Sequence, residues 1–206
     1  MADIPLTRIN AAPEKAAAIR AAVRAVGFPE SSRRRLASQK DAAAFHALVA
    51  DPLVSGPIYT LPKLVTVEAT RQFIARHIEE QARGEGLLLL EFDEAGALAA
   101  YHDIQIWPEY AAAELGGAIR PDRQNAGAGG AGAAAAFGWL FEAIGVDLIC
   151  ETAALDNIRT RKLLERIGFR LLGEIESRTP GGGARPSLYF EMTRAEWNAR
   201  QPSTID

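Results

Sequence analysis

The first 83 residues show apolar positions at helical spacing, interrupted by a proline-rich stretch. Residues 13–26 begin with a proline, end before a glycine, and carry three aliphatic residues at i, i+4 and i+7: Ile19, Val23 and Val26. This pattern predicts a helix that docks on the main fold or on a partner. Residues 41–50 and 67–83 predict two more helices. The connection between these two helices is predicted to be an irregular loop at a binding rim because it contains Pro52, Pro57 and Pro62.

Beyond residue 86 the pattern changes to short apolar runs typical of strands. The runs that predict strands lie at 87–92, 97–107, 111–119, 146–152, 169–177 and 185–192. Two amphipathic helices are expected among them, one ending at Gly145 and one over 157–167, and Thr193 is expected to cap a last short helix. The second half therefore reads β-loop-α-β-α-β-β. Gly116 and Gly117 interrupt a strand, which predicts a bulge or the close approach of another backbone or of a ligand.

Composition narrows the class of protein. The length of 206 residues predicts one domain with an appendage. The net charge of −3 argues against a protein dedicated to binding duplex DNA. The polar, turn-prone stretch 30–40 includes Arg33–Arg35, which we interpret as a solvated charge run rather than a phosphate patch. Cys150 cannot form an internal disulfide and is expected to be an inert buried residue. The sequence shows neither a signal peptide nor a run long enough to span a membrane, so a cytoplasmic location without membrane association is expected.

Four glycines stand between a predicted strand and a predicted helix: Gly127, Gly129, Gly130 and Gly132. Glycine is a poor helix former, so this cluster predicts a loop where phosphates approach the free amides of a helix start. An alanine–glycine loop without a ligand is the plain alternative. A Walker A loop is excluded because no Lys follows the glycines. Gly127, Gly129 and Gly132 also match the G-x-G-x-x-G pattern of dinucleotide-binding proteins, and Glu151 lies 19 residues beyond Gly132. An NAD(P)-dependent oxidoreductase therefore stays open as an alternative, although the elements predicted around this loop fit that fold poorly.

Three segments, in order, resemble the GNAT superfamily of N-acetyltransferases. The segment Gln124-x-x-Gly127-x-Gly129 resembles the family's Q/R-x-x-G-x-G/A loop. NIRTRKLLERIGF, at 157–169, resembles the helix that follows, and AELG, at 113–116, resembles part of the fourth strand. The resemblance spans about 33–195 and is closest to the branch that includes ribosomal-protein N-terminal acetyltransferases. It implies an α+β fold whose mixed sheet of six to seven strands is bulged so that the fourth and fifth strands splay, with helices flanking it. Residues 1–32 are then a helical extension, 33–200 the domain and 201–206 a tail.

The resemblance implies that acetyl-CoA is the cosubstrate, that no metal is needed, and that a backbone N–H at the strand bulge polarises the thioester. The residues that it assigns to the cofactor are Gly117, Ala118, Ile119, Arg123, Gln124, Asn125, Ala126, Gly127, Ala128, Gly129, Gly130, Asn157 and Arg161. The two arginines are equally well read as solvated side chains.

The same resemblance places Glu114 at the position of a general base, which would remove a proton from a primary amine or position a water. A structural glutamate is the alternative. Relatives often carry a Tyr as general acid where this chain has Leu164, and Tyr189 is a weak substitute.

The acceptor is expected to be a peptide N-terminus or a small-molecule amine, and Tyr59, His102 and Trp107 are candidate contacts. A satisfied structural histidine is the more common reading of His102. Homodimers are common among relatives, and a non-catalytic acyl-CoA sensor on the same fold stays open as an alternative.

Overall fold

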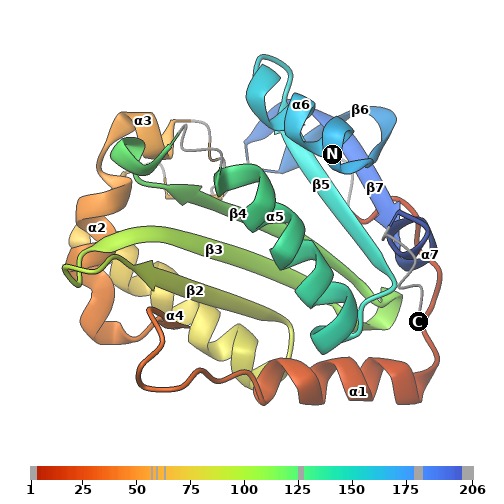
Figure 1. Ribbon diagram of the computed structural model, residues 1–206, viewed down its shortest axis with the longest axis horizontal. Helices are drawn as coiled ribbons and strands as arrows, with labels where there is room; N and C mark the ends of the chain where they lie inside the picture. The colour runs from red at the N-terminus through yellow and green to blue at the C-terminus, as the bar shows by residue number, and fades with distance from the viewer. Residues whose placement is uncertain are drawn as a thin grey trace, which may run out of the picture.

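The computed structural model describes residues 4–56, 58, 60–62, 64–124, 128–178 and 183–200. A central seven-stranded sheet has the strand order β1-β2-β3-β4-β5-β7-β6 (Figure 1). The strands are β1 (Arg34–Leu36), β2 (Gly86–Phe92), β3 (Leu98–Trp107), β4 (Ala112–Ile119), β5 (Leu148–Ala154), β6 (Arg170–Arg178) and β7 (Ala184–Thr193). The helices are α1 (Pro13–Arg24), α2 (Ala42–Val49), α3 (Pro52–Ser55), α4 (Val67–Arg83), α5 (Ala128–Trp139), α6 (Ile158–Ile167) and α7 (Arg194–Asn198). The mixed α+β sheet expected from the sequence is confirmed.

The one parallel pair in the described sheet is β4 with β5, and it is short. Only Ala112 and Ala113 of β4 face partners on β5, at Leu148 and Ile149. Beyond these two pairs the strands separate, and Figure 1 shows them as a V that opens toward the first turn of α5. On its other side β4 keeps an unbroken antiparallel register with β3 from Ala112 to Ile119. The expected distortion at Gly116–Ala118 therefore takes the form of a positive φ of 141° at Gly117, with no change of register.

Each face of the sheet has its own hydrophobic core. On the first face, which we call the α5 face, residues of α1 and α5 such as Ile19 and Phe137 pack with Leu89 and Ile104. On the second, the α4 face, residues of α2 and α4 pack with Leu88, Leu90 and Tyr101: they include Phe45, Phe73 and Ile74. Because side chains alternate along a strand, odd-numbered residues of β3 from Tyr101 onward lie on the α4 face and even-numbered ones on the α5 face.

The N-terminal residues are part of this packing. Ile19 and Val23 of α1 are buried in the core of the α5 face, so the helix docks on the main fold. Residues before α1 cross β7 on the α4 face: the Leu6 N–H donates to the Tyr189 hydroxyl at 2.8 Å, and the Thr7 N–H to Glu191 at 3.0 Å.

Two short elements were not predicted from the sequence. Residues 34–36, inside the stretch interpreted as a solvated charge run, form the edge strand β1, paired with β2. The Arg34 side chain also bonds to Glu91 of β2 at 3.1 Å, so part of the arginine run is paired within the sheet. The second is α3, a single helical turn in the proline-rich connection, where the Asp51 side chain accepts from the Leu53 N–H. No helix in the described part of the chain is long and apolar enough to cross a membrane.

Candidate active site

The point where β4 and β5 separate is bridged by two carboxylates. On the α5 face, Glu151 of β5 accepts a hydrogen bond from the Leu115 N–H of β4 at 2.9 Å. This amide would bond to a neighbouring strand if the pairing continued. On the α4 face, the Thr152 hydroxyl donates to the Glu114 carboxylate, also at 2.9 Å. Consecutive residues of each strand therefore place one glutamate on either side of the gap.

The two glutamates have different surroundings. Glu151 is 5% exposed, whereas Glu114 is half-buried. Burial and the nearby negative charge of Glu114 raise the pKa of Glu151 well above its ordinary value, and the bond from Leu115 opposes this only in part. Its surroundings therefore favour the neutral carboxylic acid over the carboxylate. A pair of carboxyl groups with unlike surroundings can divide the roles of acid and base.

A charged pair lies next to Glu114 on the α4 face. The register sets Asp103 of β3 opposite Gly116, two residues along from Glu114. Asp103 accepts from the Nε2 of His77 at 2.9 Å and from the Thr60 hydroxyl at 3.2 Å. The other ring nitrogen of His77 lies 2.8 Å from the Phe73 carbonyl oxygen. Since both nitrogens face acceptors, the ring is an imidazolium.

The protonation of His77 has a clear cause. Burial by itself would lower the pKa of His77, but the hydrogen bond and the charge of Asp103 outweigh it and raise the pKa. Glu80, whose carboxylate lies 3.7 Å from His77, adds a further negative group to this side of the gap. The α4 face of the gap is consequently rich in acidic side chains.

His102 is separated from Glu114 by the sheet. It lies opposite Gly117, but on the α5 face, because it alternates with Asp103 along β3. Its Nε2 is 3.8 Å from Glu91. The contact with His102 and the ion pair with Arg34 lower the pKa of Glu91 to about 2 against the opposing effect of burial. Trp107 does lie on the α4 face, by the same alternation, and Tyr59 lies outside the described residues.

The end of β4 and the start of α5 form the second part of the site. Gln124 donates to the Ile119 carbonyl at 2.8 Å and accepts from Arg159 at 2.7 Å. Asn125, Ala126 and Gly127 lie outside the described residues, and α5 begins at Ala128. The amides of its first turn have no partners within the helix and so favour an anion. Gly130 packs against α6 so closely that an added Cβ would lie 2.6 Å from Nη2 of Arg166.

The arginines at this end of the cleft are not all those predicted. Arg161 pairs with Glu165 at 2.8 Å on the exposed side of α6. The residues of α6 that line the cleft are instead Arg159, Thr160, Lys162, Leu163, Leu164 and Arg166. The three basic residues among them lie with Leu163 at the i, i+3, i+4, i+7 spacing of one helix face, and Arg161 does not belong to that face. That spacing was visible in the sequence, but which face of the helix meets α5 was not.

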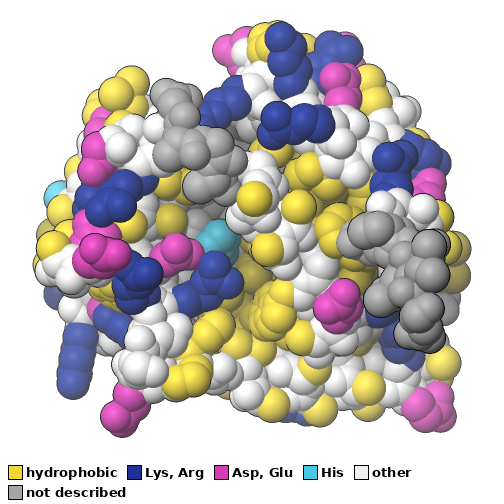
Figure 2. Space-filling model, viewed as in Figure 1, with side chains coloured by type: hydrophobic (Ala, Val, Ile, Leu, Met, Phe, Trp, Pro, Cys, Tyr) yellow, Lys and Arg dark blue, Asp and Glu magenta, His cyan; other side chains and the backbone are white. Residues whose placement is uncertain are grey.

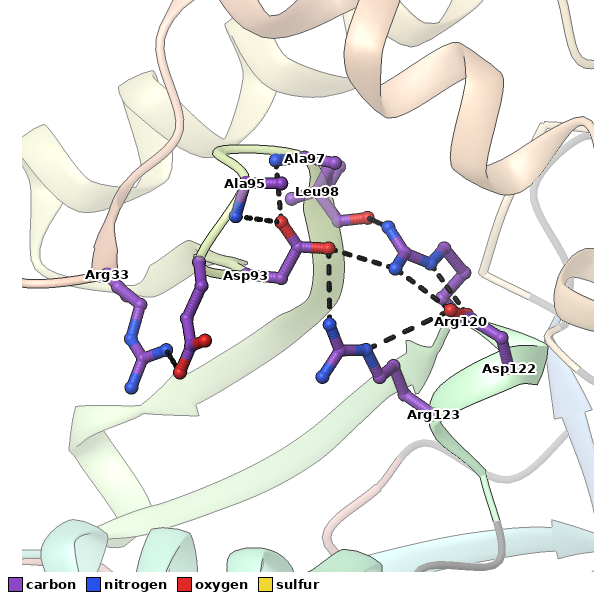
Figure 3. Close-up of polar contacts among 9 residues, drawn as sticks. Arg33, Asp93, Ala95, Ala97, Leu98, Arg120, Asp122 and Arg123 are labelled. Carbon is purple, nitrogen blue, oxygen red and sulfur yellow. Dashed lines mark hydrogen bonds and ion pairs between the residues drawn. The ribbon is translucent and has the colours of Figure 1, made fainter.

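Arg123 lies in a network with two aspartates (Figure 3). The Asp93 carboxylate lies between the guanidinium groups of Arg120, at 2.9 Å, and Arg123, at 3.4 Å. Arg120 also pairs with Asp122 at 2.6 Å. The Ala97 N–H and Arg120 together hold the pKa of Asp93 below its usual range. The network joins the β2–β3 turn to residues 121–123, and so fixes the turn directly before the glycine-rich segment.

Three residues that the sequence analysis considered for cofactor binding or for the general acid have structural roles. Asn157 caps α6, since its Oδ1 accepts from the Thr160 N–H at 3.1 Å. Leu164 is buried in the core of the α5 face. The Tyr189 hydroxyl donates to Glu191 at 2.6 Å while it accepts from Leu6, so it holds the N-terminal segment. Burial raises the pKa of Tyr189, which makes it a poor proton donor.

The two glutamates at the gap and the end of β4 border one continuous cleft of about 1670 Å³. Its lining includes Glu114, Gly117, Gln124, Glu151 and Asn157, together with Asp103 on the α4 face. Figure 2, which views the molecule from the α5 side, shows a hollow with a histidine side chain at its floor and basic side chains above it over α6. The described residues hold no group of three or more His, Cys, Asp or Glu arranged to bind a metal ion.

Comparisons with known proteins point to one family. Residues 34–170 match a sequence model described as an acetyltransferase (GNAT) domain. A comparison with curated proteins gives no match. The structure is similar to a ribosomal-protein-S5-alanine acetyltransferase from Vibrio fischeri, with a TM-score of 0.67 and 16% identity over 86% of this chain and 100% of that one.

Two further solved structures are similar. The first is Mycobacterium smegmatis RimJ in complex with CoA-disulfide, with a TM-score of 0.67 and 21% identity over 79% of this chain and 82% of that one. The second is a spermidine N-acetyltransferase from Vibrio cholerae in complex with CoA and spermine, with a TM-score of 0.65 and 16% identity over 80% and 96% of the two chains. At these identities the likenesses establish the fold.

Proposed function

Because the chain belongs to the GNAT acetyltransferase family, we propose that it transfers an acetyl group from acetyl-CoA to a primary amine in the gap between β4 and β5. The observation that carries the proposal is the gap itself. The strands part after two residue pairs, and each side of the opening carries a glutamate. An extended pantetheine arm can add to the exposed edge of β4 there, as a peptide adds to a sheet edge.

The phosphate end of acetyl-CoA fits the first turn of α5. Free amides and the helix dipole favour a pyrophosphate at that position, and Arg159 and Arg166 supply positive charge from α6. Gly129 and Gly130 remove side chains from the first turn, so the phosphates can approach the backbone. The thioester, when bound, supplies an electrophilic carbonyl at the other end of the gap.

The backbone of β4 offers a donor for the oxyanion that forms on this carbonyl. The Leu115 N–H points from β4 toward β5, where Glu151 accepts it. Since N–H groups alternate along a strand, the Gly117 N–H is the next one directed into the gap. We assign Gly117 to oxyanion stabilisation, in keeping with the bend that its positive φ places there.

Glu114 is the proposed base. An acceptor amine arrives as an ammonium and must lose a proton before it can attack. Glu114 lies at the α4 side of the opening and is held by Thr152, so it can take this proton directly or through a water. The acidic groups beside it, Asp103 and Glu80, favour a cationic acceptor. We propose that the acceptor enters from the α4 face, past Trp107.

Acetyl transfer is tested by incubating the purified chain with acetyl-CoA and a panel of peptides, polyamines and aminoglycosides. The release of free CoA thiol and the acetylated product, identified by mass, are both followed. We expect turnover with at least one amine and a loss of about 100-fold or more in kcat for Glu114→Gln. Binding of acetyl-CoA without turnover of any amine would instead indicate a non-catalytic acyl-CoA sensor.

A further inference from the structure

Transfer from a thioester requires that the sulfur leave, and the described residues near the gap include few proton donors for it. A thiolate with an ordinary pKa near ~8.5 leaves more readily when it is protonated as the C–S bond breaks. Leu164 has no proton to give and is buried in the core. The Tyr189 hydroxyl is engaged by Leu6 and Glu191. A different group must supply the proton if the protein supplies it at all.

Glu151 lies at the required place. Its side chain is on the α5 face of β5, two residues from Ala153, which packs in the same core as Leu164. It reaches across the opening to the Leu115 N–H at 2.9 Å, and it lines the cleft. Glu114 lies on the other side of the same opening, bound to Thr152. A thioester in the gap would therefore have one carboxyl group on each face.

The surroundings of Glu151 favour its neutral form. It is 5% exposed, it forms no ion pair among the residues that the structure describes, and its charged neighbour is the like-charged Glu114. A buried carboxylate without a cation is strongly disfavoured. One oxygen of the neutral group accepts from Leu115, which leaves the hydroxyl on the other oxygen as a donor.

We propose that Glu151 is the general acid of the reaction and gives its proton to the departing CoA sulfur, opposite Glu114 as the base. The inference rests on the proposed acetyl transfer. The amine nitrogen forms a bond to the acetyl carbon, and the C–S bond breaks. The acceptor ammonium gives up two protons in total, through Glu114 to solvent. One proton passes from Glu151 to sulfur and is replaced from solvent, so that one proton is released per turnover.

A purely structural role for Glu151, as a brace between β4 and β5, makes a different prediction. Glu151→Gln keeps a carbonyl oxygen that can accept from Leu115 but has no acidic proton. We would compare acetyl-CoA with its selenoester analogue, because a selenol is more acidic than a thiol and leaves without protonation. Glu191→Gln is the matched control, since it replaces another buried glutamate in the adjacent strand, where it binds the N-terminal segment.

The proposal predicts that Glu151→Gln lowers kcat with acetyl-CoA by about 100-fold or more, and lowers it with the selenoester by less than about 3-fold. In Glu191→Gln the ratio of the two rates should stay as in the wild type. Equal losses with both donors in Glu151→Gln would show a brace, and no loss with acetyl-CoA would also overturn the proposal.

The wild-type protein gives a second test that needs no variant. Its rate with acetyl-CoA should fall at alkaline pH as Glu151 ionises, and the fall should be absent with the selenoester. The same alkaline fall with both donors would refute the assignment even if Glu151→Gln does not fold. Failure of the wild type to acetylate any amine would refute the proposed function itself, which is a separate outcome.

Discussion

Gly116 and Gly117 are neighbours in β4, yet the structure predicts opposite results for the same substitution. At Gly117 the backbone has a φ of 141°, and an added Cβ would overlap the Tyr101 carbonyl oxygen and lie 3.2 Å from the His102 Cα. At Gly116 an added Cβ would meet Asp103 at 3.5 Å and 3.7 Å, which is ordinary contact. Gly116→Ala is therefore a control for the effect of a methyl group in this strand.

The cost of Gly117→Ala has two sources. A conformation that essentially only glycine adopts costs another residue about 1–3 kcal/mol. An extra carbon forced into packed atoms costs about 1–3 kcal/mol more. We expect Gly117→Ala to lower the free energy of unfolding by about 2–6 kcal/mol, out of a typical total of about 5–15 kcal/mol. At about 2–4 °C per kcal/mol for a chain of this length, Tm should fall by at least about 4 °C.

Urea denaturation and thermal melting, both followed by circular dichroism, measure the two variants against the wild type. Gly116→Ala should change the free energy of unfolding by less than about 1 kcal/mol, because a strand alanine costs less backbone entropy than glycine. If Gly117→Ala unfolded within about 1 kcal/mol of Gly116→Ala, the close approach of β4 to the Tyr101 backbone would be refuted. The account of the distorted strand beside the gap would then fail.

Two further predictions concern charges around the cleft. Arg166→Ala should raise the Kd for CoA several-fold at low salt, measured by calorimetry, whereas Arg161→Ala should leave it unchanged because Arg161 pairs with Glu165; equal effects of the two would contradict the assigned face of α6. The pKa of His77 is raised in the folded protein, so its contribution to stability is full below the ordinary value of 6.5 and is lost as pH rises through the folded pKa. Urea denaturation should therefore show His77→Gln to be more destabilising at pH 6 than at pH 9, and a constant difference would refute the imidazolium–Asp103 pair.

Long periodic elements were predictable from the sequence because local patterns determine them. Apolar spacing and a glycine at the C-terminal end predict both α4 and α6. The capping residue Thr193 predicts the start of α7. The short strand β1 did not follow, because three residues dominated by arginine show no alternation; its pairing with β2 forms it. Secondary structure that depends on a partner strand leaves little signal in its own residues.

The candidate site, too, was predictable from the sequence only in part. The glycine-rich segment stands out in the sequence by its residue types, and Glu114 is predicted as a site residue through the resemblance to the GNAT family. The sequence could not tell on which face of β3 His102 lies, since that requires the register and the helix packing. Asp103, one residue further, is the side chain that shares a face with Glu114. In the sequence Glu151 stands out only by its distance from the glycines, in the oxidoreductase alternative, whereas the structure places it in the gap, buried and bonded to Leu115.

The central claim is that the opening between β4 and β5 is where acetyl-CoA binds, and a crystal structure of the chain with CoA tests it most directly. We predict that the pantetheine arm lies along β4 near Gly117, that the pyrophosphate contacts the first turn of α5, and that the sulfur lies between Glu114 and Glu151. CoA bound elsewhere, or a gap that stays closed by the bond between Glu151 and Leu115 while CoA binds another surface, would contradict this account.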